Sequence, residues 1–333
     1  MPADAPLHLR LATEIKGWPL VHAAIGLVPF VVLAMATGNA LWIKASLLTI
    51  ATMIAEDRLA MRPIGVLAHG LVVIGGTYLL LLAERVPALF VIACMLLAAG
   101  VILLASRGKK LRTLGNWTFV PVLILANDLH GGRSIDALMH AAPASLPYLL
   151  VALVPALVSA YIRSRGKTAA RWSRLDDFGT RAPYAEDLIA MVAGVGITAL
   201  MVEYGHTDHA QWVIWGAASI VTGAVDTAQT KLQNRAFGVI VGVPVGVLLG
   251  QYVVPHSSMA VTLATLAAFL TLVAFQRYVV EYFFRCVFVS LAIVLANQSV
   301  VDAFERLTHV LAGGLIGLAC VVGVHIAARR FLR

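Results

Sequence analysis

The fold is decided by a pair of matching stretches, ALWIKASLLTIATMIAE (residues 40–56) and AQWVIWGAASIVTGAVD (residues 210–226). They align at an offset of 170 residues, which places Trp42 on Trp212. A repeat of this length predicts two copies of a whole structural unit, not a short solenoid module. In membrane proteins the substrate site often lies where two such copies meet.

The composition is that of a membrane protein. The 333 residues are 60% hydrophobic and 13% charged, with a mean hydropathy of +0.88, whereas average charged content is about 25%. Lipid leaves open backbone groups unsatisfied, so the spans are expected to be helices. We predict an all-α membrane protein with twelve transmembrane helices, at about 18–37, 40–55, 63–83, 86–105, 114–129, 144–162, 184–203, 210–225, 236–254, 258–275, 279–298 and 306–327.

The basic residues predict the orientation. In this topology, 21 of the 25 Lys and Arg lie on one side of the membrane, and the exceptions are Lys44, Arg85, Arg133 and Arg306. The positive-inside rule therefore places both termini in the cytoplasm. The net charge of +8 is explained by topology. Nucleic-acid binding is not expected, because no basic patch is interleaved with aromatic residues.

Each half contains six predicted spans. Because six is even, both halves enter the membrane from the same side. The two six-helix repeats are therefore parallel, related by a pseudo-two-fold axis along the membrane normal. We predict a first repeat at 1–162, a cytoplasmic linker at 163–183 and a second repeat at 184–333.

Ionisable residues inside a bilayer are functional candidates by default. Lys44 either snorkels to the outer interface or contacts an anion at the mouth of a pathway. Arg277, Glu281 and Arg285 share one helix face, so Glu281 can pair with both arginines. This triad either joins helices or uses an arginine to grip a substrate carboxylate.

Three pairs of residues recur at the 170-residue offset. Glu56 and Asp226 are either helix-end carboxylates paired with nearby basic residues or proton-coupling groups. Asn127 and Asn297 either bond a neighbouring helix or line a hydrated path. The tryptophans Trp42 and Trp212, with Trp215, either belong to the interfacial belt or stack on a planar ligand.

Other kinds of chemistry find little support. His206, Asp208 and His209 form a trio without the spacing or the fourth ligand of a metal site. No nucleophile motif, phosphate loop or nucleotide fingerprint is present. We therefore expect neither an enzyme nor a bound cofactor or metal.

Residues 212–250 resemble the signature of the fusaric acid resistance family, also called the aromatic acid exporter family. The resemblance consists of Trp212, a polar turn from Asp226 to Lys231, and Arg235 followed by a glycine-rich helix. The stretch FERLTHVLAGGLIG (304–317) is similar to the family's arginine-then-glycine entry into its last helix. Larger members place a soluble cytoplasmic domain after each half-set of helices, whereas this sequence has the 163–183 linker between its halves. Those larger members supply the precedent for a periplasmic adaptor protein as partner.

The resemblance implies efflux of small organic anions across the bacterial inner membrane, with aromatic carboxylic acids as the expected substrates. If Glu56 and Asp226 couple protons, the proton gradient is the expected energy source. The expected substrate contacts are Trp42, Lys44, Arg62, Asn127, Trp212, Arg235, Arg285 and Asn297, and the expected proton-coupling residues are Glu56 and Asp226. Two alternatives remain open. One is a passive organic-anion channel on the same scaffold, and the other is a membrane scaffold without transport.

Overall fold

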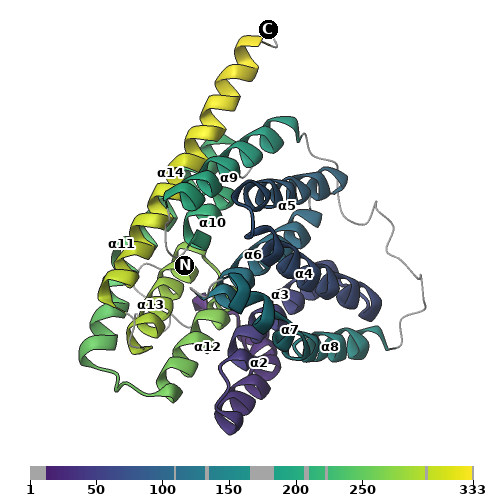
Figure 1. The fold of residues 1–333 in the computed structure, drawn as a ribbon, viewed down its shortest axis with the longest axis vertical. Coiled ribbons are helices and arrows are strands. Elements are labelled where there is room, and N and C mark those ends of the chain that lie inside the picture. The colour runs from purple at the N-terminus through teal and green to yellow at the C-terminus, as the bar shows by residue number, and fades with distance from the viewer. Residues whose placement is uncertain are drawn as a thin grey trace. The chain divides into compact units, whose positions relative to one another are not determined.

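The computed structural model describes residues 13–108, 110–131, 135–165, 184–205, 210–221, 224–296 and 299–331. These residues form helices joined by short connections (Figure 1). The helices are α2 (Gly17–Thr37), α3 (Leu41–Leu59), α4 (Pro63–Ala83), α5 (Pro87–Arg107), α6 (Leu111–His130), α7 (Ile135–Val151), α8 (Val154–Ser164), α9 (Ala185–Gly205), α10 (Ala210–Ile220), α11 (Val225–Tyr252), α12 (Ser258–Ala274), α13 (Tyr278–Leu295) and α14 (Val300–Phe331).

The helix ends follow from local chemistry. Pro63 and Pro87 open α4 and α5, where proline loses no helical hydrogen bond. Gly38 and Gly131 close α2 and α6 with φ of 66° and 53°, a left-handed conformation that glycine adopts without steric cost. The short connections between helices are thus encoded in the sequence.

Eight helices among the described residues are long and apolar enough to cross a membrane. The predicted all-α membrane class is therefore confirmed at this level. The other predicted spans correspond to α3, α6, α10 and α12, which lie outside this set. Helix α10 has 11 residues, so it extends only about 16 Å at 1.5 Å per residue. The count of twelve spans stays a prediction.

The chain divides into two compact units. The first unit contains the described residues through Ile43 together with Gln233–Leu307. Within it, α2 packs against α12, and α12 packs against α13. The backbone of Lys16 donates to the carbonyl of Ala274 at 2.7 Å. The first unit therefore combines an early helix with late ones.

A glycine ridge on α11 brings this helix against α13 inside the first unit. A Cβ atom at Gly242 would lie 2.7 Å from the carbonyl oxygen of Phe283, and one at Gly246 would lie 2.3 Å from that of Val287. No side chain fits at such distances. The small-residue spacing seen in the sequence thus produces direct contact between the two helices, as it commonly does in membranes.

The second unit contains Lys44–Leu232 and the chain from Thr308 onward. Within it, α5 packs against α9, and α4 packs against α6 and α8. Gly313 and Gly317 of α14 approach α10 closely, since a Cβ at Gly313 would lie 2.1 Å from the carbonyl oxygen of Val213. Each unit thus takes helices from both halves of the sequence.

Several helices keep the 170-residue offset closely. Their starts at 17, 87 and 111 in the first half correspond to starts at 185, 258 and 278 in the second. The first helix of each half also packs against the fourth helix of the other, α2 against α12 and α9 against α5. The parallel six-helix repeats and their boundaries at 162 and 184 stay a prediction that these correspondences favour.

Candidate functional site

The centre of the candidate site is Tyr282, a fully buried tyrosine in the first unit. Arg235 of α11 lies against it and is also buried. Its Nη2 donates to the Tyr282 hydroxyl at 3.0 Å, and its guanidinium carbon lies 4.8 Å from the ring centroid. Gly238, one turn further along α11, permits this approach because a Cβ there would meet the Tyr282 ring at 2.7 Å.

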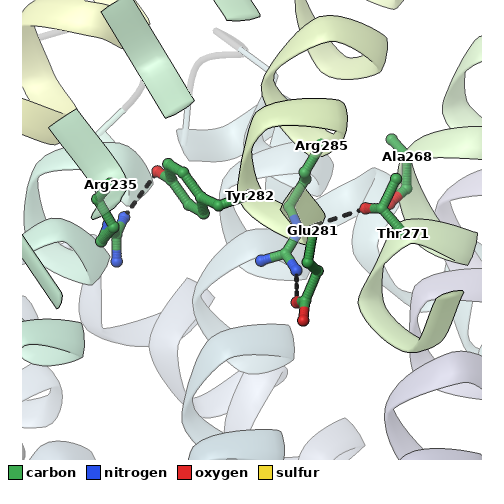
Figure 2. Close-up of polar contacts among 6 residues, drawn as sticks. All are labelled: Arg235, Ala268, Thr271, Glu281, Tyr282 and Arg285. Carbon is green, nitrogen blue, oxygen red and sulfur yellow. Dashed lines mark hydrogen bonds and ion pairs between the residues drawn. The ribbon is translucent and has the colours of Figure 1, made fainter. Parts of the chain in front are cut away.

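Arg285 approaches the same ring from within α13. Its guanidinium carbon lies 5.7 Å from the centroid of Tyr282, and its Nε donates to Thr271 Oγ1 of α12 at 3.4 Å. Its Nη2 forms an ion pair with Glu281, one turn earlier on α13. Figure 2 shows Arg235 on one side of Tyr282 and the Arg285–Glu281 pair near Thr271 on the other.

Arg306 of α14 is the third arginine and has no exposed surface. It interacts electrostatically with Tyr282. We call Arg235, Arg285, Arg306 and Tyr282 the arginine cluster. Sequence reasoning did not select Arg306 as a site residue. Two signals were nevertheless present, its position among the few basic residues outside the cytoplasmic set and its place in the FERL motif.

The arginine cluster has a clear electrostatic consequence. Removing a charge from water costs several kcal/mol, and the guanidinium groups around one phenol also repel one another. An anion that binds between the guanidinium groups would reduce both the cost of burying their charge and their mutual repulsion. A carboxylate is well suited to this because it can accept two parallel hydrogen bonds from a guanidinium group. The arrangement is therefore suited to binding a small anion.

Aromatic rings continue from the cluster along α13. Tyr278 lies 5.8 Å from Tyr282, while Phe284 stacks on Phe275 at 5.0 Å and on Phe288 at 6.3 Å, between centroids. Aromatic pairs at these spacings are favourable. The surface near the arginines can thus contact an aromatic ring as well as a charge.

Of the two ion pairs predicted for Arg277, Glu281 and Arg285, one is present. Glu281 pairs with Arg285. Arg277 instead pairs with Glu14 at 2.8 Å, so the prediction that Glu281 serves both arginines is wrong. Arg277 is the residue preceding α13, and its extended backbone takes it out of the helical register that the prediction assumed.

In the second unit, Lys44 donates a hydrogen bond to the C-terminal end of α6. Its Nζ donates to the carbonyl of Asp128 at 2.8 Å, next to half-buried Asn127 in the last turn of α6. A cation is favourable there because the helix C-terminus carries partial negative charge. Lys44 and Asn127 are thus brought to the same region, while Asn297 lies outside the described residues.

Glu56 and Asp226 differ in environment. Glu56 is fully buried, pairs with Arg163 of α8 at 2.9 Å and accepts a hydrogen bond from Ser159 at 3.2 Å. Its pairing partner is therefore Arg163 of α8, and not a basic residue nearby in the sequence. Asp226 is exposed at the start of α11.

The predicted contacts Trp42 and Trp212 belong to different units, and each lies near another aromatic ring. Trp42, in the first unit, lies 6.3 Å from Phe30, and Trp212, in the second, lies 6.1 Å from Trp215, between ring centroids. Arg62 is half-buried and precedes α4.

No cluster of metal ligands occurs among the residues that the structure describes. The trio of His206, Asp208 and His209 lies outside them. The absence of a metal site therefore stays an expectation.

Comparison with protein families gives a match to the family described as fusaric acid resistance protein-like, over residues 195–320. The match includes every residue of the arginine cluster. No curated protein and no solved structure matches the chain. Together with the apolar helices, the family match indicates a multi-pass membrane transporter. The resemblance seen in the sequence is thus confirmed over residues 195–320, which are similar to the fusaric acid resistance protein-like family.

Proposed function

We propose that the protein exports small organic anions, and aromatic carboxylates in particular, across a bacterial inner membrane. The observation that carries this proposal is the placement of two buried arginines, Arg235 and Arg285, against the ring of Tyr282, with buried Arg306 near enough to interact with it electrostatically. The arginines supply contacts for a carboxylate, and the neighbouring rings of α13 supply contacts for an aromatic group.

The substrate is proposed to be the anion alone, with no cofactor, metal, nucleic acid or enzymatic reaction involved. Both termini are assigned to the cytoplasm on the distribution of basic residues. The lipid bilayer is the surrounding medium, and a periplasmic adaptor protein remains a candidate partner on the family precedent alone.

Transport is proposed to use the proton gradient. Glu56 is the stronger coupling candidate because its carboxylate is buried beside Arg163. The exposed position of Asp226 favours the second candidate function, a passive anion channel. The inside-negative potential by itself drives an anion outward with about 2.3 kcal/mol per charge per 100 mV.

The test is flux of benzoate from reconstituted vesicles. We expect Arg285→Gln to reduce flux by about tenfold or more, because truncating one partner of a buried charge contact costs roughly 2–5 kcal/mol. Arg329→Gln, an exposed arginine near the end of α14, is the matched control and should retain flux. Equal flux in both variants, with both folded, would reject the site.

Imposing the voltage and the pH gradient separately distinguishes the two functions. Flux that requires an inward proton gradient supports the coupled transporter, and Glu56→Gln should then remove this requirement. Flux that follows voltage with no response to the pH gradient would establish the channel instead. If the folded wild-type protein gives no flux under either condition, the remaining alternative is a membrane scaffold without transport.

A further inference from the structure

The arginine cluster contains a carboxylate of its own. Glu281 forms an ion pair with Arg285 inside the first unit, and adjacent Tyr282 places its ring against the same arginine and against Arg235. The two neighbouring side chains therefore present a carboxylate and a phenol ring to the arginines. These are the groups of an aromatic acid.

The two members of the ion pair are held unequally. Arg285 is fixed by Thr271 and by the ring of Tyr282 in addition to Glu281. Among the described residues, the Glu281 carboxylate accepts a hydrogen bond from Arg285. The side chain of Glu281 is 20% exposed and that of Arg285 is 8% exposed. Glu281 can therefore turn away while Arg285 stays in place.

A substrate carboxylate and the Glu281 carboxylate are chemically equivalent ligands for a guanidinium group. Both cannot occupy the same position at Nη2 of Arg285. If the substrate binds there, its apparent affinity is lowered by the free energy needed to release Glu281. The internal pair also keeps Arg285 from being left buried without a counter-charge when the site is empty, which would be costly.

We propose that Glu281 is an internal counter-ion that an entering carboxylate displaces from Arg285. Glu281 thereby sets the affinity of the site and favours release of the substrate after transport. This inference rests on the proposed function, because it requires a carboxylate substrate at Arg285.

The test measures benzoate binding to the full-length protein in lipid nanodiscs by calorimetry. We expect Glu281→Gln to bind benzoate about three- to tenfold more tightly than the wild type, because the competing charge is removed. Benzamide, which has the same ring without a charge, should bind both proteins equally. Glu186→Gln removes an exposed carboxylate on α9 and should leave benzoate affinity unchanged.

The outcomes separate this inference from the proposed function. If the wild type binds benzoate and Arg285→Gln loses binding, but Glu281→Gln binds equally or more weakly, the internal counter-ion is refuted and the anion site stands. If neither the wild type nor Glu281→Gln binds benzoate, both fail. Should Glu281→Gln not fold, Glu281→Asp provides the test. Its shorter side chain reaches Arg285 less well, so tighter benzoate binding supports the inference and weaker binding refutes it.

Discussion

The helix pair α12–α13 in the first unit and the pair α5–α6 in the second differ at positions related by the 170-residue offset. In α12–α13, Arg285 donates to Thr271 across the pair. The corresponding residues in α5–α6 are Gly115 and Val101. A Cβ at Gly115 would lie 2.7 Å from the Cα of Val101, so these helices touch where the other pair holds a charge.

At these aligned positions, one predicted repeat has the arginine of the candidate site, whereas the other has a direct helix–helix contact. Arg235 aligns with Gly65, and Tyr282 aligns with Arg112. Arg112 in turn pairs with Asp187 at 3.4 Å and donates to the carbonyl of Val221, so it joins α6 to α9 and to the end of α10. Repetition therefore preserves the helices, whereas Arg235, Tyr282 and Arg285 belong to the second half.

The largest expected effect concerns the arginine that sequence reasoning missed. Arg306→Gln should weaken benzoate binding about tenfold or more, because it removes a buried charge that interacts electrostatically with Tyr282 and such truncations cost roughly 2–5 kcal/mol. Calorimetry on the nanodisc-embedded protein measures the change. Arg330→Gln, an exposed change on the same helix, should bind benzoate like the wild type. Unchanged affinity in folded Arg306→Gln would remove this arginine from the site.

A smaller effect is expected in the packed helix pair. Gly115→Ala should lower the free energy of unfolding by about 1–3 kcal/mol, as overpacking does in a tight interface. A Cβ added at Gly100 of α5 would meet no atom of another helix within 4 Å, so Gly100→Ala should be neutral or stabilising by up to about 1 kcal/mol. Unfolding in increasing dodecyl sulfate reports both changes. Equal responses would contradict the packing difference.

The smallest effect comes from making the first pair resemble the second. Thr271→Val introduces the residue type that stands at Val101 and removes the hydrogen bond to Arg285. Such a bond contributes about 0.5–1.5 kcal/mol, so benzoate affinity should fall by about threefold. Thr265→Val on α12 is the control, since its hydroxyl bonds the carbonyl of Val261 in its own helix. A larger loss in the control would show that α12 itself, not the contact with Arg285, is responsible.

The helices were predictable because apolar runs and flanking prolines and glycines are local signals. Arg235 was indicated by the family resemblance, and Arg285 by its spacing of four from Glu281 on one helix face. Their convergence on Tyr282 was not predictable, since it depends on distances between helices. The same limit explains why Arg163 was missed as the partner of Glu56, 107 positions away along the chain.

The packing of α2 against α12 sets an order of events during synthesis. Helix α2 ends at Thr37 and α12 begins at Ser258, so the ribosome must add about 220 residues between them. At roughly 5–20 residues per second this takes on the order of 10–45 s. During that interval the face of α2 that will contact α12 has only lipid or the insertion machinery against it, so α2 finds this neighbour late in synthesis.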